Sequence, residues 1–484
     1  MEATAHAVPD PKRWWALALL CSAFFMVILD VSIVNVALPS IKQELHFSQA
    51  DLQWVLSAYA LTFGGFLLLG GRAADLLGRR RVFMVGVALF TLASLACGLS
   101  NSEGTLIAAR AVQGLGAAIL SPAALSIIST TFVEGAERNK ALGIWGAIGG
   151  SVAAVGVLAG RVLTKWLGWE WIFFVNVPVG ATALLLTRSV VRESHADTAE
   201  RHYDAAGAVL VTSSLVLLVF ALTRADDVGW GTAQTLLILA ASAVLMAAFL
   251  AVELRSKAPL VPLGIFARLR TLSGANVVGF LLGALTFAMF FMLSLYMQQV
   301  LGMSALQAGA GYLPVALTAI ASSGVAQAFV TRIGVKPAMA FGIALMGLGN
   351  VWFTQVSADG SYWVDLLPGF FVIGVGLGFS FVPMSIAALA GVAPNEAGLA
   401  SGLINTTQQI GGALGVALFS TVSTTRTDHL LRSGNSLKPA LTEGFSLAFW
   451  VAVGFAVAGL VATLTMIRRE ELATTVPAEA TTAG

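Results

Sequence analysis

Long apolar stretches alternate with short polar segments along almost the whole chain. About 20 consecutive apolar residues are enough for an α-helix to cross the hydrocarbon core of a bilayer. We count fourteen such stretches, and they predict an all-α polytopic membrane protein with 14 transmembrane helices. They lie near residues 14–38, 53–71, 82–100, 104–132, 142–163, 169–188, 205–223, 233–253, 271–297, 305–329, 337–356, 364–391, 402–423 and 443–467.

The composition supports a chain that is embedded in a lipid bilayer. Of its 484 residues, 57% are hydrophobic and only 11% are charged, with a mean hydropathy of +0.85. A soluble protein of this length is far less apolar. The formal net charge of +2 gives no reason to expect a nucleic-acid partner. Cys21 and Cys97 both fall in apolar stretches, which favours two buried thiols over a disulfide.

The placement of basic residues predicts the orientation in the membrane. If the N-terminus is cytoplasmic, nineteen of the 27 lysine and arginine residues fall in inside segments and six in outside loops. Basic residues are enriched in cytoplasmic loops. We therefore expect a multi-pass protein of the cell membrane with both termini cytoplasmic, and an even number of spans agrees with this.

Two segments of the chain nearly repeat each other. The stretch LLGRRRVFMVGVAL at 76–89 is similar to RIGVKPAMAFGIAL at 332–345, an offset of 256 residues. Chance similarity between glycine-rich helix starts is the alternative, but two parallel six-helix halves with two extra helices between them explain the offset most simply. This predicts a 6+2+6 organisation: a tail at 1–13, an N-terminal half at 14–190, two linker helices at 205–253, a C-terminal half at 271–467 and a tail at 468–484.

The apolar stretches lack the residue clusters that most enzymes need. All five histidines lie outside the predicted spans, without a neighbouring group of cysteines or acids. A metal site or a histidine-based catalytic site inside the membrane is therefore not expected. The phosphate-binding pattern GxxxxGK[ST] is also absent, which argues against ATP hydrolysis. We expect no enzyme and no bound cofactor, and a transporter would draw energy from an ion gradient.

Two charged residues stand deep inside apolar stretches, and a third, Arg161, lies near the end of the fifth stretch. Asp30 interrupts FMVILDVSIVNVALPSI, and Arg110 interrupts the fourth stretch. A charge at the centre of a spanning helix costs roughly 2.5 to 3.5 kcal/mol, so such residues usually have a function. Arg110, Gln113 and Gly114 are three and four residues apart and share one helix face. A functional pair of Asp30 and Arg110 and a purely structural buried pair both remain open.

Four motifs resemble the major facilitator superfamily, specifically its fourteen-span drug:proton antiporter family of the EmrB/QacA type. They are LDVSIVNVALP at 29–39, GRAADLLGRRRVF at 71–83, LIAARAVQGLGAA at 106–118 and GIWGAIGGSVAAVGVLAG at 143–160. The resemblance covers nearly the whole chain. It departs from the family pattern at Val157, where a proline is usual, and at Arg161, where a glycine is usual.

The resemblance implies a role for each motif. Proton coupling falls on Asp30, with Arg110 as a relay partner, and protons are the coupling ion. The second motif would form and break ion pairs between the halves, and the fourth would allow close helix packing. The matching residues are Gly71, Asp75, Gly78, Arg79 and Arg80 in the second motif, and Gly149, Gly156 and Gly160 in the fourth.

Polar residues in the spans suggest where a substrate would bind. The candidates for the substrate cavity are Asn35, Gln113, Asn405, Thr406 and Gln409. Hydrogen bonds between helices are an equally good explanation for the group near residue 405. With one deep acid and two arginines in the spans, we expect small amphipathic substrates that are neutral or anionic.

The resulting hypothesis is efflux of drugs, antibiotics or secondary metabolites, driven by the proton-motive force through antiport and alternating access. The alternatives are a metabolite, peptide or siderophore transporter of the same fold, or a facilitator without antiport. The family mostly works as monomers, so we expect a monomer in the lipid bilayer.

Overall fold

The computed structural model describes residues 11–47, 49–52, 54–133, 135–194, 204–229, 231–256, 259–393 and 396–468, and these residues form helices without any β-strand. The elements are α1 (Arg13–Glu44), α2 (Gln49–Leu52), α3 (Trp54–Leu77), α4 (Arg79–Gly98), α5 (Glu103–Thr131), α6 (Ala136–Trp166), α7 (Trp171–Phe174), α8 (Asn176–Val190), α9 (Ala205–Val228), α10 (Ala233–Glu253), α11 (Gly264–Arg268), α12 (Arg270–Leu295), η1 (Tyr296–Val300), α13 (Ala305–Gly311), α14 (Leu313–Ile333), α15 (Val335–Phe353), η2 (Tyr362–Leu366), α16 (Leu367–Leu389), α17 (Ala397–Arg432) and α18 (Leu437–Met466), where η marks a π-helical turn.

Each predicted apolar stretch coincides with a helix, or with two helices that follow each other directly. Within the described part of the chain, ten helices are long and apolar enough to cross a membrane. Several helices extend beyond the apolar stretch. For example, α17 has 36 residues, whereas its apolar stretch covers 402–423. The apolar length reports the part inside hydrocarbon, and the helix itself continues into the polar flanks.

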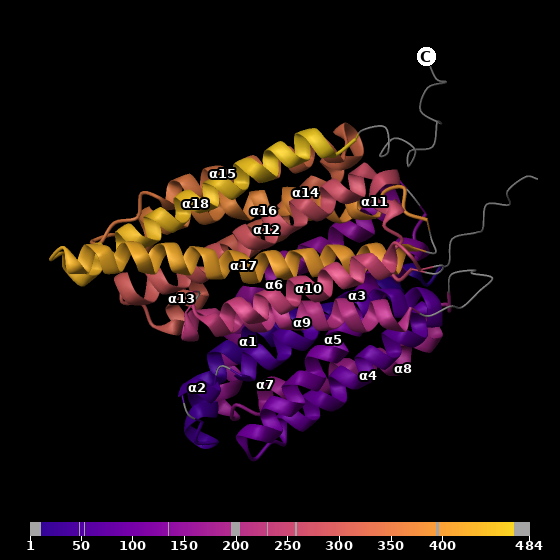
Figure 1. Ribbon diagram of the computed structural model, residues 1–484, viewed down its shortest axis with the longest axis horizontal. Coiled ribbons are helices and arrows are strands. Elements are labelled where there is room, and N and C mark those ends of the chain that lie inside the picture. The colour runs from indigo at the N-terminus through magenta and orange to yellow at the C-terminus, as the bar shows by residue number, and fades with distance from the viewer. Residues whose placement is uncertain are drawn as a thin grey trace, which may run out of the picture.

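The helices form two groups with a hairpin between them (Figure 1). Helices α1 to α8, indigo to magenta, lie on one side, and α12 to α18, salmon to yellow, lie on the other. The hairpin of α9 and α10 is held together by Ser214 and Ser242, whose hydroxyls each donate to the carbonyl of the other residue, at 2.9 and 2.8 Å. Helix α9 packs against both α3 and α17, so the hairpin contacts both groups.

The two copies of the sequence repeat adopt the same turn. Gly78 precedes α4 with φ of 105°, and Gly334 precedes α15 with φ of 93°. Positive φ values of this size favour glycine because it has no Cβ. The two residues are equivalent in the repeat, so both halves use glycine to reverse the chain between two long helices.

Glycines bring α3 and α4 close to α5 at the centre of the N-terminal half. A Cβ at Gly114 would overlap the Thr62 hydroxyl on α3, and one at Gly116 would meet the backbone nitrogen of Phe90 on α4. Small residues at helix contacts let backbones approach closely in a membrane. This packing fixes the position of Arg110 and Gln113, which lie one turn earlier on α5.

Candidate functional site

Asp30 lies on α1 and is completely buried. Its Oδ2 accepts a hydrogen bond from Arg110 Nη1 on α5 at 2.5 Å, and its Oδ1 accepts from Gln113 Nε2 at 2.7 Å. Asn176 Nδ2 on α8 also donates to Oδ1, at 3.2 Å. The carboxylate therefore accepts hydrogen bonds from three side chains on two helices. One of these side chains, Arg110, carries the opposite charge. We call Asp30, Ser94, Arg110, Gln113 and Asn176 the Asp30 cluster.

The Arg110 guanidinium has several partners besides Asp30. Its Nε donates to the Val55 carbonyl on α3 at 2.9 Å, and its Nη1 also donates to Gln113 Oε1 at 2.6 Å. The ring of Tyr59 lies 4.3 Å from the guanidinium carbon, and that of Phe173 lies 5.8 Å away. Both distances are within the range of cation–π attraction. The charge is thus shared among a carboxylate, two neutral acceptors and two aromatic faces.

Two members of the Asp30 cluster were missed by the sequence analysis. Ser94 Oγ on α4 accepts from Gln113 Nε2 at 2.8 Å and from Asn176 Nδ2 at 3.4 Å. Both residues are buried. Their only signal in the sequence is a neutral polar residue in an apolar stretch, which is too common in spanning helices to single them out.

Gln113, a predicted residue of the substrate cavity, lies within the Asp30 cluster in this structure. Its side chain is 0% exposed and bridges Asp30 and Ser94. Gln113, one turn from Arg110, donates a hydrogen bond to the second carboxylate oxygen of Asp30. A buried carboxylate requires such a donor on each oxygen. The predicted cavity residue Asn35 lies on α1, but its side chain is outside the described residues.

The remaining cavity candidates lie on α17. Asn405 Nδ2 donates to the Ser401 carbonyl of its own helix at 2.8 Å. Thr406 is buried, and its hydroxyl has no hydrogen-bond partner among the described residues. Gln409 is half-buried. The neighbouring Thr407 donates to Asn276 Oδ1 on α12 at 3.3 Å. Part of this polar segment therefore connects helices within the C-terminal half.

Asp75 forms a second buried acid site, and this one joins the two halves. Its Oδ1 accepts from the backbone nitrogen of Gly398 at 3.0 Å, and its Oδ2 accepts from that of Leu399 at 2.9 Å. Arg79 Nη2 donates to Oδ1 at 3.0 Å. The carboxylate therefore caps the N-terminus of α17, where unpaired amides and the helix dipole favour a negative charge. We call Asp75, Arg79, Gly398 and Leu399 the latch.

Asp75 lies in a helix and not in a loop between the predicted spans 53–71 and 82–100. Helix α3 continues to Leu77, so Asp75 is in its last turn and is 0% exposed. The turn itself is reduced to Gly78. The helix can continue through Asp75 because Arg79 and the α17 amides satisfy its charge, as hydrogen bonds to ionised groups do.

Two further arginines of the second motif lie outside the latch. The Arg80 backbone nitrogen donates to Glu193 Oε1 at 3.1 Å, and Arg80 Nε lies 3.6 Å from Glu193 Oε2. Arg81 Nε lies 3.5 Å from the same oxygen. One carboxylate therefore faces two guanidinium groups at this turn.

Close backbone contact accompanies the latch. A Cβ at Gly71 would overlap the Gly398 carbonyl oxygen, and a Cβ at Gly398 would overlap the Gly71 carbonyl oxygen. Gly402 lies against the same part of α3. Glycine at these positions is what lets α3 and α17 touch, and the two halves are closed against each other at this end of the bundle.

The glycines of the fourth motif pack α6 against α1. A Cβ at Gly156 would overlap the Ser32 hydroxyl, and one at Gly160 would lie 2.9 Å from Ile33 Cγ1. Gly149 belongs to α6, but its surroundings are outside the described residues, as are the side chains of Val157 and Arg161. Both described glycines therefore stand at a close contact between α6 and α1.

The structure is a bundle of long apolar helices with a buried acid–arginine pair in one half and a charged latch between the two halves, which is the architecture of a polytopic membrane protein. The family model described as Major Facilitator Superfamily matches residues 20–416. The chain belongs to this superfamily of membrane transporters.

The chain is also similar to individual named proteins. The chain is similar to the puromycin resistance protein pur8 of Streptomyces alboniger, with 41% identity over 96% of this chain and 92% of that protein. It is also similar to the cephamycin export protein CmcT of Amycolatopsis lactamdurans, with 40% identity over 91% and 89% of the two chains. The crystal structure of the human organic anion transporter MFSD10 (TETRAN) has the same fold, with a TM-score of 0.68, 16% identity and coverage of 94% of this chain and 100% of that one.

Proposed function

We propose that the protein exports antibiotics or other small amphipathic molecules across the cell membrane in exchange for protons. The proposal includes fourteen membrane spans, as in transporters of the EmrB/QacA type. It also places both termini in the cytoplasm and makes Asp30 the proton carrier. The relatives named for resistance and export support the direction of transport. The observation that carries the proton coupling is the buried pair of Asp30 and Arg110.

The Asp30 cluster is suited to binding and releasing a proton. When Asp30 takes a proton, Arg110 loses its ionic partner. Its guanidinium then still has the Val55 carbonyl, Gln113 Oε1 and the Tyr59 ring. These neutral partners reduce the cost of a buried unpaired charge. These partners would hold the Arg110 charge in place while Asp30 exchanges its proton.

The latch supplies the conformational step. In the proposed orientation it lies at the cytoplasmic end, where it holds the two halves together. The cytoplasmic end opens only if the Asp75 carboxylate leaves the N-terminus of α17. Such ion pairs and dipole contacts are typical of switches that break and re-form as domains rock.

A single proton provides enough energy for useful export. One charge moved across the membrane is worth about 2.3 kcal/mol per 100 mV. Because about 1.4 kcal/mol is a tenfold change in an equilibrium constant, a neutral substrate would be concentrated outside roughly fifty-fold per 100 mV. The charge of Arg110 is neutralised by Asp30, so the cluster attracts neither strong cations nor strong anions. Neutral or anionic amphipathic substrates stay the proposal.

The decisive test uses inverted membrane vesicles and two assays. In the first, a proton gradient drives uptake of puromycin or a cephamycin. In the second, labelled substrate exchanges with unlabelled substrate without a gradient. Asp30→Asn should abolish the gradient-driven uptake and keep the exchange, because the variant loses the proton carrier and retains the transport path. The matched control is Asp428→Asn, which neutralises an exposed acid at the far end of α17.

Two outcomes would contradict the proposal. Full gradient-driven uptake by Asp30→Asn would remove Asp30 from proton coupling and favour a facilitator. A wild-type protein that exchanges neither compound would indicate a transporter for another class of metabolite.

A further inference from the structure

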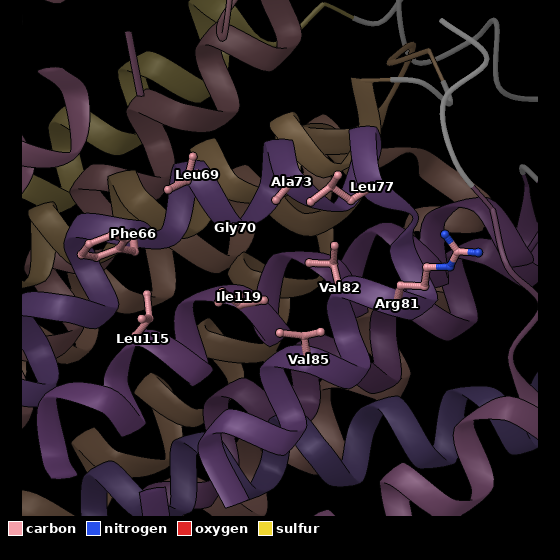
Figure 2. A pocket seen from close by; sticks show the side chains of 10 residues that line it. All are labelled: Phe66, Leu69, Gly70, Ala73, Leu77, Arg81, Val82, Val85, Leu115 and Ile119. Carbon is pink, nitrogen blue, oxygen red and sulfur yellow. The ribbon is translucent and has the colours of Figure 1, made fainter. Parts of the chain in front are cut away.

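An apolar groove of about 440 Å³ runs along the outer surface of the N-terminal half (Figure 2). One wall comes from α3 and the other from α4, and α5 forms the floor between them. The groove is outside both the Asp30 cluster and the latch. It is lined by Phe66, Leu69, Gly70, Ala73, Leu77, Arg81, Val82, Val85, Leu115 and Ile119.

Helix packing explains why the groove exists. A Cβ at Gly70 would overlap the Ala118 carbonyl oxygen, and one at Gly86 would lie 2.6 Å from the backbone nitrogen of Leu120. Both walls are therefore pressed onto α5 at glycines. Leu77 and Val85 at the rim are exposed. In a membrane transporter, such an outward-facing apolar surface faces lipid.

The length of the groove matches one leaflet of a bilayer. Phe66 and Leu77 mark its two ends on α3, and eleven residues of helix separate them. At 1.5 Å per residue this is about 16 Å. Half of a hydrocarbon core of about 30 Å is about 15 Å. An extended acyl chain of a single leaflet fits this length.

The charge at one end of the groove specifies the head group. Arg81 lies at the end next to the α3–α4 turn, and its side chain is 77% exposed. Its nearest acid is Glu193, at 3.5 Å, but Arg80 contacts the same carboxylate oxygen at 3.6 Å. Two guanidinium groups and one carboxylate leave a net positive charge where the groove meets the membrane surface. A phosphodiester without a compensating positive group complements it.

We propose that this groove binds an anionic phospholipid, with one acyl chain between α3 and α4 and the phosphate at Arg81. The proposed orientation places the lipid in the cytoplasmic leaflet. The site is separate from substrate transport, so lipid binding and proton coupling can be tested independently.

The test is native mass spectrometry of the full-length protein after equilibration with phosphatidylglycerol or phosphatidylcholine at equal concentration. The wild type should bind one phosphatidylglycerol more tightly than phosphatidylcholine. Arg81→Gln should reduce this preference about fivefold, because one arginine near a membrane surface is worth about a factor of five. Arg332→Gln removes an exposed arginine from the end of α14, before the equivalent turn of the C-terminal half, and should leave the preference unchanged.

A second variant tests the acyl chain separately. Ala73→Phe places a ring in the groove and should weaken binding of both lipids to a similar extent, with puromycin exchange retained. Equal binding of both lipids by the wild type would overturn the proposal, and so would equal losses in Arg81→Gln and Arg332→Gln. Competition by millimolar inorganic phosphate would indicate a site for free anions. A dimer that Ala73→Phe dissociates would indicate that a second copy occupies the groove.

Discussion

Asp30 and Asp75 are both buried aspartates that pair with an arginine, but their partners belong to different parts of the molecule. The side-chain partners of Asp30 are Arg110, Gln113 and Asn176, all within the N-terminal half. Asp75 instead accepts from backbone amides of α17, 323 and 324 residues further along the chain. The first acid is enclosed in one half, and the second joins two halves.

This difference separates two tasks that a proton-driven transporter must perform. When the halves rock as rigid bodies, contacts within one half persist and contacts between halves break. If the proposed function holds, the environment of Asp30 changes mainly when a proton binds, whereas that of Asp75 changes whenever the latch end opens. Proton binding and opening of the latch are coupled if protonation of Asp30 alters the packing of α1 and α5 against the other half.

The largest expected effect comes from removing the charges of the Asp30 cluster one at a time and then together. Asp30→Asn leaves Arg110 without its ionic partner, and the neutral partners of Arg110 should hold the loss of stability below the about 3–5 kcal/mol that breaking a buried pair typically costs. Asp30→Asn/Arg110→Gln removes both charges and should recover most of the thermal stability without restoring gradient-driven transport. Thermal unfolding in detergent and vesicle uptake measure the two quantities. A double variant that transports against a gradient would show that the pair is only structural.

The next largest effect is expected at the latch. Asp75→Asn removes the charge that caps α17, and such a contact is worth up to about 2 kcal/mol when partly buried, or about thirtyfold in the closing equilibrium. Hydrogen–deuterium exchange at the amides of Gly398 and Leu399 should become faster, and the maximal transport rate should fall. Asp30→Asn should leave these amides protected. If both variants deprotect them equally, the two acids do not act as separate devices.

Contact between the halves can be disturbed without changing any charge. Gly71→Ala places a methyl group against the Gly398 carbonyl, so the latch should close less completely and transport should slow several-fold. Gly324→Ala is the matched control, because a Cβ there meets no atom within 4 Å. The same amide exchange at Gly398 reports closure. Equal effects of the two substitutions would mean that the backbone contact is not limiting.

The smallest single effect is expected from Tyr59→Phe, which keeps the ring that faces Arg110. Tyr59→Phe keeps an aromatic face and should change transport less than twofold, since the Tyr59 hydroxyl has no hydrogen-bond partner among the described residues. Tyr59→Leu removes the face and should cost about 1–2 kcal/mol of stabilisation of the Arg110 charge, or about five- to thirtyfold in uptake. Uptake at several external pH values checks this. A larger defect in Tyr59→Phe than in Tyr59→Leu would assign the role to the hydroxyl.

The helices and two of the charged residues were predictable because they depend on composition along the chain. An apolar stretch of sufficient length forms a helix wherever it falls, and Asp30 and Arg110 are conspicuous in such a stretch. Ser94 and Asn176 were not predictable, because a single neutral polar residue in a span has many uses. The position of Gln113 required knowledge of which helix faces α5.

The sequence by itself determined that the chain is a membrane protein, which segments form its long apolar helices, and where charge is kept inside them. These properties follow from the local cost of placing each residue in hydrocarbon. Only the tertiary structure decided which groups meet each charge. The partners of Asp75 are backbone amides, which every residue except proline carries and no motif identifies. The groove beside Arg81 likewise depends on how closely α3 and α4 approach α5, a distance that is set by packing across helices.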